Sequence, residues 1–117
     1  MGWRRAVSRD AAEAAQWSRR AKDLLPALVG LLVRDWGARR VVLFGSLATG
    51  GFRASSDIDL VVEGLAPATF FHACAAVDRL AGDLLVDLVP LESARPFVHD
   101  VLARQECEVL YDGRPAK

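Results

Sequence analysis

A chain of 117 residues can bury one hydrophobic core but is too short for two ordinary domains, so we expect a single domain over residues 1–117. Its 15 basic and 15 acidic side chains cancel, which excludes a global field favouring nucleic acid or an anionic membrane, although a local cluster could bind phosphate. Cys74 and Cys107 form no CxxC pair, and no apolar run is long enough for a membrane span, so we expect a soluble, cytoplasmic protein without zinc or disulfides.

The N-terminal segment, about residues 1–36, is predicted to be helical. Asp10 and Glu13 resemble a capping box, which places a first helix at about residues 10–22 that could run on into the next. From Asp23, leucines recur every three or four residues, with Pro26 tolerable only in a first turn, so a second helix is expected to end at Gly37. Its apolar stripe should face a sheet.

Short apolar runs alternate with helical patterns over about residues 39–112. Strands are expected at 41–44, 57–62, 84–89 and 108–111, and helices at 67–81 and 94–106, with an irregular loop or a short turn of helix at 47–56. This order predicts an α+β domain: a small mixed β-sheet with helices packed mainly on one face.

Asp57 and Asp59 are the sharpest local feature of the sequence. Side chains two apart on a strand point to the same face, so both carboxylates would lie side by side. Magnesium prefers hard oxygen ligands and takes one or two protein carboxylates, with phosphates and water completing its shell. The alternative is two solvated aspartates at a strand entrance.

Gly45 and Ser46 directly follow the first predicted strand. Glycine lets a phosphate approach the backbone and serine adds a hydroxyl donor, although most such pairs simply end a strand in a turn. Arg53, in the loop before the aspartates, could bind the outer phosphates or be solvated.

Asp87 is the only ionisable residue in the apolar run 84–89, where an unpaired carboxylate would be costly to bury. The negative charge could be compensated by a structural partner, such as an arginine or a set of backbone amides, or by the metal that Asp57 and Asp59 would bind. Asp83 has the same strand parity but is expected to cap or turn, so we prefer Asp87.

His72 and His99 lack a partner at helical spacing and are assigned surface or packing roles. The tryptophans are expected to anchor the helical layer, namely Trp3, Trp17 and Trp36.

From Val41 to Val62 the sequence resembles the signature of polymerase-beta-type nucleotidyltransferases: an apolar strand, Gly-Ser, ten residues, then Asp-x-Asp and another strand. It is most similar to minimal nucleotidyltransferase (MNT-domain) antitoxins, which have about this length and end in a strand like Glu108–Tyr111. The resemblance covers roughly residues 25–112 and leaves the N-terminal helix unexplained.

The resemblance implies the nucleotidyltransferase fold and a site on named residues. Gly45 and Ser46 would hold the β- and γ-phosphates of ATP, and Asp57, Asp59 and Asp87 would be the metal and catalytic residues for two Mg²⁺ ions. AMP would pass to an acceptor that, in MNT systems, is usually a tyrosine of a HEPN-family ribonuclease toxin.

Two alternatives to this enzyme remain. A non-catalytic antitoxin would neutralise its partner by binding alone, and a structural subunit could carry the motif by accident. A homo-oligomer is possible, and direct binding to nucleic acid is not expected. The sequence identifies neither the acceptor nor the nucleotide.

Overall fold

The computed structural model describes residues 2–52, 56–93, 100 and 107–113. Its helices are α1 (Gly2–Gly30), extended by a π-helical turn η1 (Leu31–Asp35), α2 (Gly45–Thr49) and α3 (Pro67–Ala81). Its strands are β1 (Arg40–Phe44), β2 (Asp57–Glu63), β3 (Leu85–Pro90) and β4 (Glu108–Asp112). The helix predicted at 94–106 lies outside the described residues apart from residue 100, which is helical.

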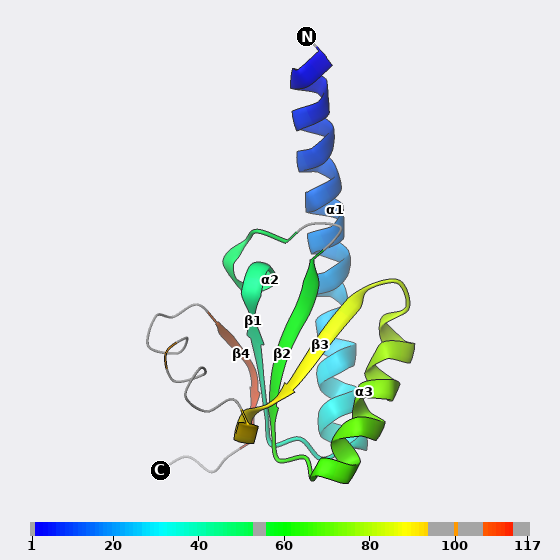
Figure 1. Ribbon diagram of the computed structural model, residues 1–117, viewed down its shortest axis with the longest axis vertical. Coiled ribbons are helices and arrows are strands. Elements are labelled where there is room, and N and C mark those ends of the chain that lie inside the picture. Colours follow the sequence, from blue (N-terminus) through cyan, green and yellow to red (C-terminus); the bar gives the residue numbers. More distant parts are fainter. Residues whose placement is uncertain (1, 53–55, 94–99, 101–106, 114–117) are drawn as a thin grey trace.

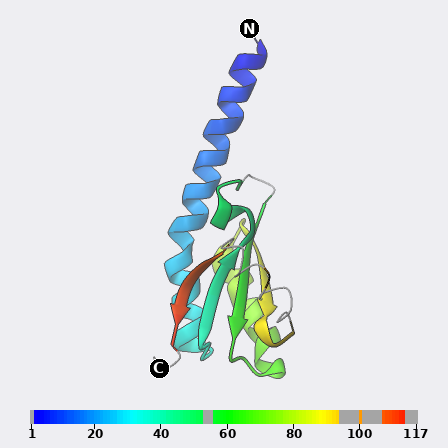
Figure 2. The ribbon, with the colours of Figure 1, turned by 90° about the vertical axis from the view of Figure 1, so that its left-hand side faces the viewer.

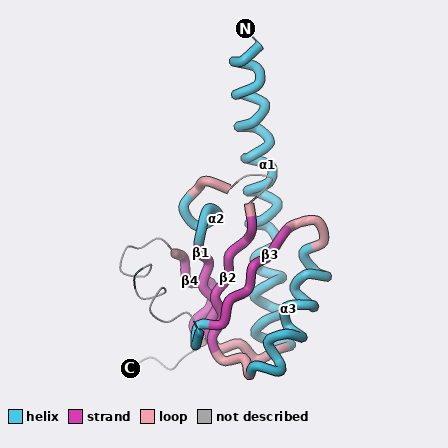
Figure 3. The backbone as a smooth tube through the Cα atoms, in the orientation of Figure 1, coloured by secondary structure: helices cyan, strands magenta, loops and turns pink. Residues whose placement is uncertain are grey.

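The four strands form one mixed sheet in the order β3-β2-β1-β4 (Figures 1 and 3). β1 pairs antiparallel with both β2 and β4, while β2 and β3 run parallel. The parallel pair needs a crossover, and α3 provides it. The predicted α+β fold is confirmed, including the neighbouring positions of the first two strands.

The core lies between one face of the sheet and the helices α1 and α3. Alternate residues of β1 and β2 point to this face, and the largest fully buried side chains include Leu28, Leu32, Leu43, Ile58 and Leu60. A smaller apolar cluster occupies the opposite face, with Val42, Phe44, Val61 and Leu91 as its buried members. The helices therefore cover one face, as expected.

The first predicted helix does run on into the next as one continuous helix, but the placement of Pro26 in a first turn is wrong, because Pro26 lies in the interior of α1. Pro26 is exposed, whereas Ala21, Leu25 and Leu28 on the other side of the helix are buried in one continuous stripe. Packing of that stripe outweighs the one backbone hydrogen bond that a proline removes. The predicted end is confirmed, because Gly37 has a φ of +79° directly after the helix.

The N-terminal part of α1 extends well beyond the sheet, and the molecule measures 55 × 32 × 22 Å as a result (Figures 1 and 2). Where α1 reaches the body, Arg20 donates a 2.6 Å hydrogen bond to Asp83 in the turn before β3. The guanidinium also lies 4.6 Å from the ring centroid of Trp17, which packs against the core. Asp83 is thus a turn residue, as predicted, and it connects α1 to the α3–β3 turn.

Two aromatic expectations also hold. Trp36 packs against the core, and its ring stacks on that of His72 with centroids 6.4 Å apart, so His72 has a packing role.

Both cysteines are free thiols. Within the part of the chain that the structure describes, no helix is long and apolar enough to cross a bilayer.

Candidate active site

Asp57 and Asp59 lie at the start of β2, on the face of the sheet opposite α1 and α3. Ile58 and Leu60, which alternate with them, are fully buried in the main core, so the two carboxylates point away from it. Asp57 is exposed and Asp59 is half-buried. The predicted side-by-side arrangement on one face is what the strand produces.

Asp87 joins them from the neighbouring strand. In the parallel pairing of β2 and β3 the Cα partner of Asp59 is Asp87, so both side chains belong to the same face. Asp87 is exposed, because β3 is an edge strand among the described strands and this face of it is open. Its carboxylate is solvated and needs no buried partner.

Gly45 places the end of β1 against these carboxylates. Its φ of +74° is in the left-handed region, and a methyl group on its Cα would collide with the carboxylate of Asp59. The chain then enters α2, and the N–H groups of Gly50 and Gly51 each donate to the Ser46 carbonyl at 2.8 Å at the C-terminal end of this short helix. Only glycine permits this approach of backbone and carboxylate.

The electrostatics of the site centre on Asp59. Partial burial raises the pKa of its carboxyl group, and the neighbouring charges of Asp87 and then Asp57 raise it further. Its cross-strand neighbour is Phe44, a buried side chain on the same face. Phe44 was not singled out from the sequence, although its parity with Val42 along the strand would have placed it there.

The remaining predicted site residues are only partly placed. Ser46 lies half-buried in α2, one residue after Gly45. Arg53 lies outside the described residues. Of the predicted site residues, the structure therefore places the three aspartates and Gly45 near one another. The predicted role of Arg53 stays a prediction.

The donor chemistry at this site fits a hard divalent cation, because three carboxylates share one face and their mutual repulsion already raises the pKa of Asp59. Their side chains are not gathered around a common point: among the described residues, no group of three His, Cys, Asp or Glu could hold a metal ion as it stands. Binding a cation would require these side chains to converge.

The arrangement of a Gly-Ser turn beside paired strand carboxylates agrees with a family match. Residues 25–104 match the family model described as a nucleotidyltransferase domain. The chain belongs to the nucleotidyltransferase domain family. The match thus begins within α1, and residues before 25 lie outside it.

Solved structures similar to this nucleotidyltransferase domain include one described as a minimal nucleotidyltransferase, with 29% identity and a TM-score of 0.63 over 80% of this chain and 93% of that chain. A toxin–antitoxin structure with AMP-PNP has 27% identity and a TM-score of 0.59, over 74% and 72% of the two chains. A mutant of the toxin–antitoxin pair MntA–HpeT has 28% identity and a TM-score of 0.55, over 72% and 69%. No curated protein matches significantly.

Proposed function

We propose that this nucleotidyltransferase domain transfers AMP from ATP to a tyrosine of a HEPN-type ribonuclease toxin and so acts as its antitoxin in the cytoplasm. The observation that carries the proposal is the alignment of Asp57, Asp59 and Asp87 on two adjacent strands beside Gly45. Similarity to chains of toxin–antitoxin structures, one of them with the ATP analogue AMP-PNP, supports the choice of partner and nucleotide.

Each residue has a distinct part in the proposed reaction. Asp57 and Asp59 would hold two Mg²⁺ ions, and Asp87 would complete the ligand set for one of them. Bound magnesium supplies Lewis-acid stabilisation of the triphosphate and lowers the pKa of the acceptor hydroxyl. Gly45 lets the outer phosphates approach the backbone, and the Ser46 hydroxyl donates to them. Arg53 would add a charged donor for the same phosphates.

The chemical step is an in-line displacement at the α-phosphorus. The tyrosine oxygen forms a bond to that phosphorus, the bond to the bridging oxygen of pyrophosphate breaks, and pyrophosphate leaves with its electron pair. Asp87, exposed on the open face, accepts the acceptor proton. No residue of this chain is covalently modified.

Neutralisation of the toxin by binding alone is the other candidate. It gives no role to three carboxylates on one face, where partial burial and then the charges of Asp87 and Asp57 raise the pKa of Asp59. The enzyme reading explains that arrangement, because a cation compensates the charges.

The position of the label distinguishes transfer from binding. The chain is incubated with magnesium, a HEPN-type toxin candidate and ATP labelled at the α- or the γ-phosphate, and protein-bound label is counted. We expect the α-label but not the γ-label to stay on the toxin, and at least a hundredfold loss with Asp57→Asn. No α-label despite a stable complex would favour binding alone.

A further inference from the structure

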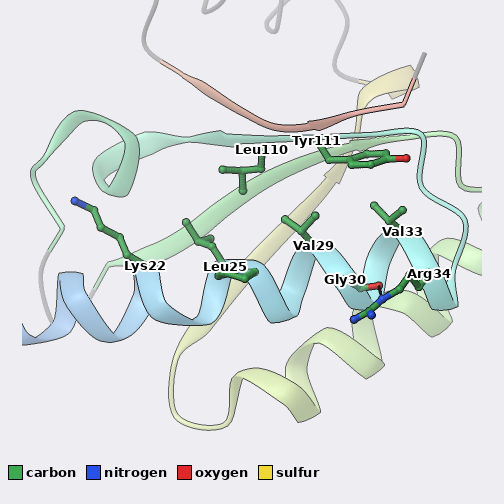
Figure 4. A pocket seen from close by; sticks show the side chains of 9 residues that line it. Lys22, Leu25, Val29, Gly30, Val33, Arg34, Leu110 and Tyr111 are labelled. Carbon is green, nitrogen blue, oxygen red and sulfur yellow. Dashed lines mark hydrogen bonds between the residues drawn. The ribbon is translucent and has the colours of Figure 1, made fainter. Parts of the chain in front are cut away.

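An open groove of about 590 Å³ lies between α1 and β4 (Figure 4). Leu25, Val29 and Val33 point from the helical side toward β4, and Leu110 and Tyr111 point back from the strand. The lining is largely apolar, and Tyr111 is 36% exposed. An apolar surface of this kind, rimmed by polar groups, is typical of an interaction site.

A β-bulge in β4 creates the strand wall of this groove. Val41 pairs with Tyr111 while Val42 pairs with Val109, so Leu110 is the extra residue and lies next to Tyr111 on the same side. A bulged edge is a poor template for adding another strand. The groove is therefore better suited to a helix than to an extended segment.

The helical wall continues beyond the sheet as a seam along α1. Ala11, Ala15, Ser18 and Lys22 are spaced at i, i+4, i+7 and i+11 and fall on the same side of the helix as Val29. Ala11 and Ala15 are exposed and Ser18 is half-buried. Small side chains allow another helix to approach closely, and this part of α1 precedes the region matched by the family model.

Charge indicates what the groove and seam would bind. The charged residues lining the groove are Lys22 and Arg34, both basic and both exposed, and the Arg34 side chain turns back to donate to the Gly30 carbonyl (Figure 4). A second copy of this chain would bring the same positive charges together, which is unfavourable. An occupant with a carboxylate beside Lys22 and apolar residues along the groove would complement both the charge and the apolar lining.

We propose that the α1–β4 groove and the α1 seam dock an acidic, amphipathic helix of the toxin partner, an inference that rests on the proposed function. The groove lies on the helical side of the sheet, whereas Asp57, Asp59 and Asp87 lie on the opposite face. A partner held along α1 leaves the active-site face open to the acceptor tyrosine. Docking and chemistry therefore use separate surfaces.

The test measures the dissociation constant of the complex with the toxin candidate of the labelling assay, using full-length variants. Lys22→Glu reverses a rim charge and Ala15→Arg places a bulky side chain on the seam. We expect each to weaken the complex about tenfold or more. Matched controls are Arg79→Glu on α3 and Gln16→Arg on another side of α1, both at exposed positions and both expected to bind like wild type. Thermal melts verify that every variant folds.

The outcomes separate this inference from the proposed chemistry. Weakened binding by Lys22→Glu and Ala15→Arg supports the groove even if no label is transferred. Wild-type affinity in both variants, with label still transferred, overturns the groove and leaves the transferase intact. Absence of any wild-type complex overturns the docking inference. A wild-type dimer that these variants dissociate would overturn it too, by making a second copy the occupant.

Discussion

Two features of the structure require glycine at position 45. Its left-handed φ disfavours any side chain, and a Cβ would displace the carboxylate of Asp59. We expect Gly45→Ala to lower the free energy of unfolding by at least about 1–2 kcal/mol and to abolish AMP transfer. Chemical denaturation and the labelling assay measure the two effects.

Gly37 provides a matched control for this substitution. Its φ of +79° is nearly the same, but an added Cβ would meet no heavy atom within 4 Å. Gly37→Ala should therefore show only the backbone cost and keep full transfer. Loss of transfer in both variants at equal stability would mean that the close approach of Gly45 to Asp59 has no special role.

Asp59 is destabilising in the metal-free protein. Its pKa is raised in the folded state, so its charged form costs stability at neutral pH, and that cost disappears as the pH falls through the raised pKa. We expect Asp59→Asn to increase the free energy of unfolding at about pH 7 by up to about 1 kcal/mol, a value reduced for the exposure of the group. The advantage should shrink in acid.

Thermal melts with a chelator across this pH range measure the effect, and Asp100→Asn, at an exposed position elsewhere in the chain, serves as the control. A metal-free Asp59→Asn protein that is less stable than wild type at neutral pH would contradict the electrostatic account. The same substitution should remove stabilisation by magnesium and ATP.

Much of the site could be predicted from residue types and strand parity. The spacing of Asp57 and Asp59 fixes their common face, and the preference for Asp87 over Asp83 is supported by the pairing of Asp87 with Asp59. The exposure of Asp87 could not be predicted, because an apolar run does not reveal that its strand lies at a sheet edge. Arg53 stays a prediction.

At the scale of elements, α1 contains a removable source of instability. Pro26 lies in the interior of the helix, where it lacks the N–H that would donate to the carbonyl of Lys22. We expect Pro26→Ala to raise the free energy of unfolding by about 1–3 kcal/mol. Equilibrium denaturation in urea measures it.

Pro67 is the control, because it lies at the first turn of α3, where a missing N–H costs nothing. Pro67→Ala should give no gain. Equal gains from both substitutions would contradict the helix-interior explanation, because loss of a proline by itself makes the unfolded chain more flexible and gives no gain.

The same proline explains why a helix start was predicted near Asp23, in the interior of what is one helix. Local rules treat an internal proline as a helix start, and they cannot weigh it against the burial of Leu25, Leu28 and Leu32 in one stripe. Strand positions and the order of elements were predictable, since short apolar runs between turn residues are read locally. The β4 bulge was not, because it depends on pairing with β1.

At the scale of the molecule, the sheet separates two tasks. One face carries the core beneath α1 and α3, and the other presents three carboxylates beside a Gly-Ser turn. The family could be recognised from the sequence because its motif is local and short. The role of the N-terminal part of α1 could not be predicted in that way, because only the folded chain shows that this part extends beyond the sheet.

The intact mass of the toxin candidate, after incubation with this chain, magnesium and ATP, tests the central claim most directly. The account predicts discrete mass increases of one AMP each, absent with Asp57→Asn or Asp59→Asn and retained with the exposed control Asp100→Asn. An unchanged toxin mass, with the wild-type protein folded and bound to the toxin, would contradict the proposed transferase.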